Sequence, residues 1–208
     1  MHEQLLVHHS GFFRAALTGN FKEAQEKVIT LENDDSITFE FFVHWLYFGR
    51  FPDQSFGDDE DLLELWEASH TTVEKSDYFV HLYIFGDKYM IEELKFDALN
   101  GLFHWLKAHD ESKLPSTTAT DEAFNDLPSD SPMCHFLIEA SCKWANPMIT
   151  ACDNVEILHG IWRRLYELET AAGMLLHDHD IDICDFHDHK THRERNGCKE
   201  YERCGACK

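Results

Sequence analysis

Apolar residues recur every three or four positions over most of the chain, which is the spacing of one face of an α-helix. The first such run begins after Ser10, a residue type that caps helices well, and stops at Gly19. This run predicts a short helix over residues 11–18. Residues 37–48 are apolar on almost every side, and a helix of that kind is normally buried.

Further helical patterns follow along the chain. They lie at residues 78–90, 91–109, 133–145 and 155–177, with one more helical turn expected around Leu62 to Trp66. A different pattern occupies residues 28–31, where the sequence VITL is brief and rich in β-branched residues. That segment predicts one short β-strand, so we expect a predominantly helical α+β fold with a small residual β element.

The composition changes near Asp110, where Ser, Thr, Asp and Pro replace the helical pattern. We therefore expect a first domain over residues 1–108 and a polar linker over 109–132, with at most a short helix in the linker near Glu122. A helical extension over 133–176 and a Cys/His-rich tail over 177–208 complete the predicted organisation.

The net charge of the chain argues against some classes of binding partner. Asp and Glu number 39 against 18 Lys and Arg, which gives a net charge of −21 with His neutral. Such a chain repels phosphate backbones and anionic membrane surfaces. The sequence also shows no signal peptide and no apolar run of about 18 residues. We expect an intracellular protein, in the cytoplasm or alternatively the nucleus, that binds neither nucleic acid nor membrane.

The motifs of common enzymes do not occur. The sequence contains no Gly-rich phosphate loop, no G-x-S-x-G and no H-E-x-x-H, and its ten glycines are scattered. We therefore expect no catalytic activity.

The tail alone has the density of thiols and imidazoles that a metal site needs. The candidate zinc ligands are Cys184, His187, His189, Cys198, Cys204 and Cys207. The last two form a C-x2-C pair, and two thiolates at that spacing can bind one Zn²⁺ ion. The overall spacing matches no standard zinc finger, so a reduced tail without metal is the alternative.

Two segments resemble the BTB/POZ domain, in the form common in fungal proteins. They are VHHSGFFRAALTGNFKEAQEKVITLENDDSITFEFFVHWLYFGRFP and LYIFGDKYMIEELKFDALNGL. The resemblance covers roughly residues 4–107 and rests on the order of these elements. NDLPSDSPMCHFLIEASCKW and CDFHDH also resemble the C-terminal extension of fungal members.

The resemblance implies a protein–protein interaction module. Members of this family bind other proteins, often as homo-oligomers and often as substrate adaptors for cullin-based ubiquitin ligases. In that role Phe51, Tyr89 and Ile91 would be candidates for partner contact, and packing in the core is the alternative for all three. The 51–76 stretch is longer and more acidic than expected for a cullin contact. A metal-binding or redox-responsive protein centred on the tail is the alternative function.

The resemblance also implies two features of the structure. One core should collect Phe12, Phe13, Phe42, Trp45, Leu46, Leu82, Phe85 and Tyr89. BTB/POZ domains normally begin with a β-hairpin, and here only MHEQLLVH precedes the helix at residues 11–18. We therefore expect the hairpin to be missing and the 28–31 strand to lack its usual partners, which calls homodimerisation in the family's common mode into question.

Overall fold

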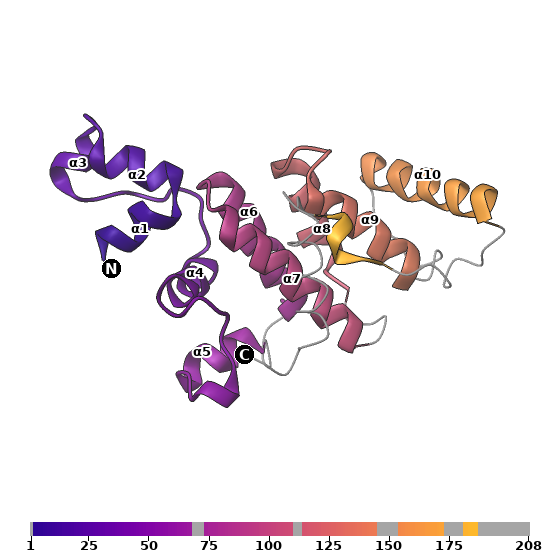
Figure 1. Ribbon diagram of the computed structural model, residues 1–208, viewed down its shortest axis with the longest axis horizontal. Coiled ribbons are helices and arrows are strands. Elements are labelled where there is room, and N and C mark those ends of the chain that lie inside the picture. Colours follow the sequence, from indigo (N-terminus) through magenta and orange to yellow (C-terminus); the bar gives the residue numbers. More distant parts are fainter. Residues whose placement is uncertain (1, 68–72, 110–113, 145–153, 173–180, 187–208) are drawn as a thin grey trace. The chain divides into compact units, whose positions relative to one another are not determined.

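The computed structural model describes residues 2–67, 73–109, 114–144, 154–172 and 181–186. The chain divides into two compact units, Met1–Leu127 and Pro128–Lys208. Figure 1 shows that the described residues of both units are mainly helical, as the sequence predicts. In the described part of the chain, no helix is both long and apolar enough to cross a membrane.

The first unit is a cluster of helices joined by short connections. Its elements are α1 (Glu3–His9), α2 (Gly11–Thr18), α3 (Lys22–Glu26), α4 (Ser36–Phe48), the 3-10 helix η1 (Gln54–Phe56), α5 (Glu60–Trp66), α6 (Lys75–Lys88), α7 (Glu92–Ala108) and α8 (Thr117–Asp126).

The predicted helices at residues 11–18 and 37–48 are confirmed as α2 and α4, each with a side-chain cap. Ser10 Oγ accepts a hydrogen bond from the backbone N–H of Phe13 at 2.9 Å, and the Asp35 carboxylate accepts one from Thr38 N–H at 2.7 Å. Helix α4 ends at Gly49, whose φ of +64° lies in the left-handed region that glycine adopts without strain. Phe42 on α4 is fully buried.

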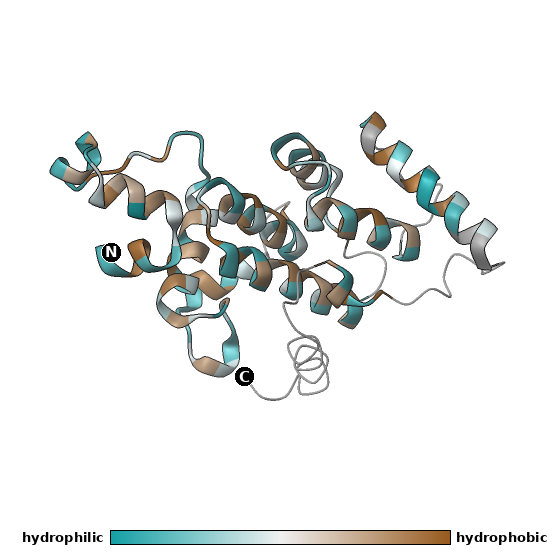
Figure 2. Cartoon of the chain, turned by 45° about the horizontal axis from the view of Figure 1, so that its top comes forward, coloured by the Kyte–Doolittle hydropathy of each residue, from teal (hydrophilic) through white to brown (hydrophobic). Residues whose placement is uncertain are grey.

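The long helices α6 and α7 pack side by side and form the centre of the first unit (Figure 1). Close packing requires Gly101 on α7, because a Cβ atom there would lie 2.3 Å from Cε1 of Phe79 on α6. Leu82, Leu94 and Leu102 are fully buried between these helices and their neighbours. In Figure 2, hydrophobic and hydrophilic residues alternate along the helices, so most of them bury one side only.

The predicted core residues are buried, with one exception. Phe13, Phe42, Trp45, Leu46, Leu82, Phe85 and Tyr89 all have exposures below 8%. Phe12 is 38% exposed and meets Tyr89 only edge-on, with 5.1 Å between ring centroids. The expectation for Phe12 was therefore wrong, because α2 turns its neighbour Phe13 and not Phe12 toward α4.

The predicted strand is not formed. Residues 28–31 are irregular, and no β-strand occurs among the described residues. Lys27 takes a left-handed conformation with φ +55° at the end of α3, and the Val28 side chain that follows is 62% exposed. The residual β element in the predicted fold class is thus wrong for the described chain. β-branched residues favour a strand only where a neighbouring strand can pair with it.

The predicted polar linker at 109–132 contains helix α8, which belongs to the first unit. Ser116 caps this helix, and its own N–H donates a 2.7 Å hydrogen bond to Asp77 Oδ1 on α6. Ala119 and Ala123 are buried, and α8 packs against α6. Small residues give α8 a weak apolar pattern, which explains why composition alone indicated a linker. The first unit accordingly reaches Leu127, beyond the predicted limit at residue 108.

The second unit contains α9 (Pro132–Trp144), α10 (Val155–Ala172) and the 3-10 helix η3 (Ile183–Asp185). Helices α9 and α10 pack against each other, and an ion pair between Glu139 and Arg164 joins them. A ring contact between Phe136 and Phe186, with centroids 5.4 Å apart, connects α9 to the segment that contains η3.

Candidate functional site

The connection between α4 and α5 folds back on itself and forms a small, well-braced surface. Gly49 and Gly57, with φ of +64° and +67°, allow the two sharp turns in this connection. The short helix η1 lies between the turns. As a result Asp58, just before α5, reaches Arg50 at the end of α4.

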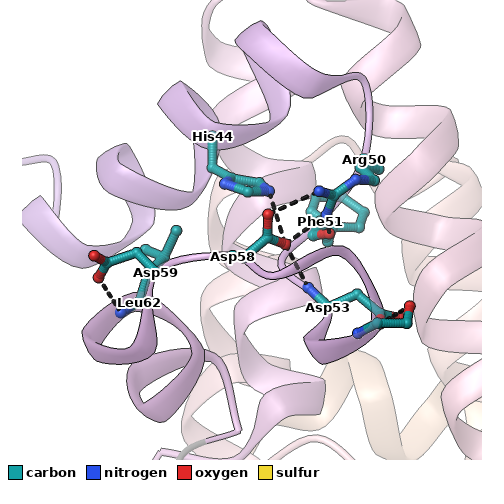
Figure 3. Close-up of polar contacts among 8 residues, drawn as sticks. His44, Arg50, Phe51, Asp53, Asp58, Asp59 and Leu62 are labelled. Atoms are coloured by element: carbon teal, nitrogen blue, oxygen red, sulfur yellow. Dashed lines mark hydrogen bonds and ion pairs between the residues drawn. The ribbon is translucent and has the colours of Figure 1, made fainter.

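Arg50 and Asp58 form a two-pronged ion pair (Figure 3). Arg50 Nη1 donates to Asp58 Oδ2 at 2.5 Å, and Nη2 donates to Oδ1 at 2.7 Å. The backbone N–H of Asp53 adds a third donor to Oδ2 at 2.8 Å. Hydrogen bonds from Arg50 above all hold the pKa of Asp58 well below its usual range, although burial alone would raise it. The carboxylate is therefore charged and fixed in place.

His44 lies behind this ion pair with its side chain only 5% exposed. Its Nε2 is 3.6 Å from Asp58 Oδ2, too far for a hydrogen bond, and has no hydrogen-bond partner among the described residues. Burial lowers the pKa of His44, and the nearby Asp58 charge opposes that effect. Burial of the ring therefore favours the neutral form of His44.

Two phenylalanine rings lie against the Arg50 guanidinium. The Arg50 Cζ atom is 4.1 Å from the ring centroid of Phe56 and 5.5 Å from that of Phe48. Phe56 is 49% exposed and Phe48 is 61% exposed. We call Phe48, Arg50 and Phe56 the Phe48–Phe56 surface. Because Asp58 fixes the guanidinium, cation–π contacts hold two solvent-exposed aromatic rings in defined positions.

Acidic side chains border this surface in the sequence. The exposed acidic residues of the same segment are Asp53, Asp59, Glu60, Asp61, Glu64 and Glu67. Asp59 caps α5 through a hydrogen bond from Leu62 N–H at 3.2 Å, and Glu67 pairs with Lys75 at 2.8 Å. Arg50 is the one basic residue between positions 49 and 67. Its charge is already matched by Asp58, so the segment as a whole is anionic.

Of the partner-contact residues expected from sequence, Phe51 lies beside the ion pair, where its carbonyl accepts a hydrogen bond from Arg50 Nη1 at 3.1 Å (Figure 3), and Tyr89 and Ile91 lie at the end of α6. Phe51 is half-buried and stacks on Trp66 with 5.2 Å between ring centroids. Tyr89 is 4% exposed and its hydroxyl donates to Asp34 at 2.5 Å; burial and this carboxylate raise the pKa of Tyr89. Ile91 is fully buried. Their positions favour the alternative of core packing, and Tyr89 and Ile91 offer little surface to a partner.

Of the expected zinc ligands, the structure describes only Cys184. It is buried within η3. His187, His189, Cys198, Cys204 and Cys207 lie outside the described residues, and no metal-binding group of three or more side chains occurs among the residues that are described. Zinc binding by the tail stays a prediction.

The sequence analysis did not single out the Phe48–Phe56 surface. Phe48 was assigned to the buried helix, and the 51–76 stretch was described only as longer and more acidic than expected for a cullin contact. Two signals were available: an isolated Arg50 within an acidic segment, and Phe56 placed next to the turn residue Gly57. Neither signal reveals the eight-residue separation at which Arg50 meets Asp58.

Comparison with known proteins adds a family match to this geometry. Residues 1–71 match the BTB/POZ domain family. The matched region includes α1 to α5 and therefore the whole Phe48–Phe56 surface, whereas the resemblance seen in the sequence was expected to extend to about residue 107. No curated protein and no solved structure matches the chain.

Proposed function

We propose that this chain, which carries a BTB/POZ domain over residues 1–71, docks a protein partner through the Phe48–Phe56 surface. The family match supports the general role of a protein–protein interaction module. The observation that carries the specific proposal is the pair of exposed phenylalanine rings held against the fixed Arg50 guanidinium.

Interfaces draw most of their binding energy from a few residues, among which aromatic side chains and Arg are enriched. Phe48 and Phe56 present apolar area that water solvates poorly, so covering them with a partner is favourable. Their positions are set before binding by the ion pair between Arg50 and Asp58. Binding therefore loses less side-chain entropy than it would with freely rotating rings.

In its finer form, the proposal is that the module acts as a substrate adaptor for a cullin-based ubiquitin ligase or as an oligomerisation scaffold. The resemblance to BTB/POZ proteins supports both roles. The surface spans the end of helix α4 and the connection after it, which contains Phe51, one of the three residues that the resemblance implies for a cullin contact. We propose no catalytic activity.

The test is light scattering on the full chain, alone and mixed with the N-terminal domain of a cullin from the same source. A discrete complex is expected for the adaptor. The double variant Phe48→Ala/Phe56→Ala should abolish it. The matched control is Phe21→Ala/Val28→Ala, which removes two other exposed apolar side chains, 59% and 62% exposed. It should leave the complex intact.

Two results would count against the proposal. A chain that stays monomeric and ignores the cullin would remove the adaptor role. A complex that survives in Phe48→Ala/Phe56→Ala would show that the partner binds elsewhere. Circular dichroism of both double variants checks that a lost complex does not reflect a lost fold.

A further inference from the structure

We infer that the partner segment accepted by the Phe48–Phe56 surface is basic as well as apolar: a stretch of another protein that combines an apolar anchor with Lys or Arg. This inference rests on the proposed function and names the chemistry of the partner. It follows from two exposed phenylalanine rings and three exposed carboxylates, those of Asp59, Glu60 and Asp61, which belong to one short stretch of the chain.

The charged side chains near the Phe48–Phe56 surface give it a net negative charge. The only guanidinium of the segment, Arg50, is matched by Asp58 in a two-pronged ion pair. Exposed carboxylates follow directly at Asp59, Glu60 and Asp61. Charges this close in sequence lie within a Debye length of roughly 8 Å of their neighbours in physiological salt, so their potentials add. A cationic segment is attracted to this potential and an anionic one is repelled.

The same charges argue against a second copy of this chain as the occupant of this surface, so an oligomerisation scaffold would use another face. Each copy has a net charge of −21, and a symmetric contact through this surface would bring two sets of like-charged carboxylates together. Like charges across an interface oppose association. A nucleic acid is disfavoured for the same reason. A basic protein segment is the occupant that satisfies both features of the surface.

The aromatic rings give the segment its anchor. Phe48 and Phe56 flank the guanidinium of Arg50, and each keeps about half or more of its area exposed. An apolar side chain of the partner can pack on these rings, while a neighbouring Lys or Arg faces the carboxylates before and within α5. This division explains why one short segment carries both exposed aromatic residues and dense negative charge.

The experiment uses three synthetic peptides of equal length as probes. One alternates Leu with Lys, the second replaces every Lys by Glu, and the third replaces every Leu by Gly. Binding to the full chain is measured by fluorescence anisotropy at low and high salt. We expect the Leu/Lys peptide to bind with a Kd that rises with salt, and the other two to bind at least about tenfold more weakly.

Variants of the chain separate this surface from general attraction to an acidic protein. Glu60→Gln/Asp61→Asn removes two charges from the first turn of α5. It should raise the Kd of the Leu/Lys peptide by about fivefold. Glu92→Gln/Glu93→Gln removes two exposed charges from the first turn of α7. Since it changes the net charge equally at an equivalent helix position, it is the matched control and should leave the Kd unchanged.

The outcomes distinguish this inference from the proposed function. If Phe48→Ala/Phe56→Ala removes binding but the Leu/Glu peptide binds as well as the Leu/Lys peptide, the docking surface stands and its basic selectivity is wrong. If both charge variants weaken the Leu/Lys peptide equally, or if no peptide binds the parent chain, the inference is overturned. The inference is supported if binding of the Leu/Lys peptide weakens in Glu60→Gln/Asp61→Asn but not in Glu92→Gln/Glu93→Gln, and if it is also lost in Phe48→Ala/Phe56→Ala.

Discussion

The Ser10 hydroxyl joins two parts of the first unit that are 79 residues apart: it donates a 2.6 Å hydrogen bond to the backbone carbonyl of Tyr89. The same oxygen accepts a hydrogen bond from Phe13 N–H at 2.9 Å and so caps α2. Ser10 is fully buried. One side chain therefore fixes the start of α2 and attaches it to the end of α6.

Replacing Ser10 by Ala should lower the free energy of unfolding by about 2 kcal/mol. The estimate combines the loss of a helix cap with a buried carbonyl that loses a donor. Urea unfolding followed by circular dichroism measures it. Ser36→Ala is the control, because Ser36 is exposed and its removal should change stability by less than about 0.5 kcal/mol. Equal effects in the two variants would contradict the dual role of Ser10.

The local half of this arrangement could be predicted from the sequence, and the distant half could not. A serine before a run of apolar residues indicates a capped helix, and α2 begins where that pattern placed it. The hydrogen bond to Tyr89 depends on how α2 packs against α6, which no short window of sequence contains. The strand predicted at residues 28–31 is absent for a related reason: a strand is stable only with a partner strand, and a short window of sequence does not show whether one is present.

At the candidate site too, the local features could be predicted from the sequence and the contact between distant residues could not. Gly49 and the buried pattern of α4 were visible in the sequence, and Gly49 does end that helix. The pairing of Arg50 with Asp58 depends on two glycine turns and could not be recognised from composition. Phe51 was singled out by resemblance, whereas the exposed rings are Phe48, next to Gly49, and Phe56, next to Gly57.

The Arg50–Asp58 ion pair makes a strong prediction for stability. Asp58→Asn keeps the shape of the side chain but leaves the Arg50 guanidinium without its counter-charge in a site where its side chain is only 19% exposed. We expect a loss of about 3 kcal/mol in the free energy of unfolding, the low end of the range for breaking a buried pair. Asp61→Asn, at an exposed position, is the matched control and should be nearly neutral. Denaturant melts of both variants test the difference.

The lowered pKa of His44 predicts that the stability of the chain depends on pH. Because burial lowers its pKa in the folded state, the unfolded chain binds a proton more readily. The stability contributed by neutral His44 is present above its ordinary pKa of 6.5 and is lost as the pH falls below that value. The chain should therefore be less stable near about pH 5.5 than near about pH 7.5, with a smaller difference in His44→Gln. Urea melts at both pH values measure this. An equal pH difference in the parent and variant would show that other groups cause it.

Gly101 should tolerate no side chain. Alanine is the better helix former, but its Cβ would meet the Phe79 ring at 2.3 Å. We expect Gly101→Ala to destabilise the first unit by about 1–3 kcal/mol, the usual range for overpacking. Asn100→Ala on the same helix is the control and should be neutral or slightly stabilising. A Gly101→Ala variant that is more stable than the parent would mean that α6 and α7 can separate without cost.

Trp45 combines core packing with one polar contact, and two substitutions separate them. It is 3% exposed, and its indole N–H donates a 2.8 Å hydrogen bond to Asp97 Oδ2 on α7. Trp45→Ala should lower the free energy of unfolding by about 3–5 kcal/mol, the range for truncating large aromatic residues in a core. Trp45→Phe keeps most of the apolar contact and loses the hydrogen bond, so it should be clearly milder.

Thermal and urea melts of both Trp45 variants test these expectations. Trp162→Ala serves as the matched control, because the Trp162 side chain is 69% exposed and its removal leaves no cavity in a core. If the melting midpoint of Trp45→Ala equalled that of the parent chain, Trp45 would not be part of the core. If Trp45→Phe were as unstable as Trp45→Ala, the hydrogen bond to Asp97, and not the packing of the ring, would be the larger contribution.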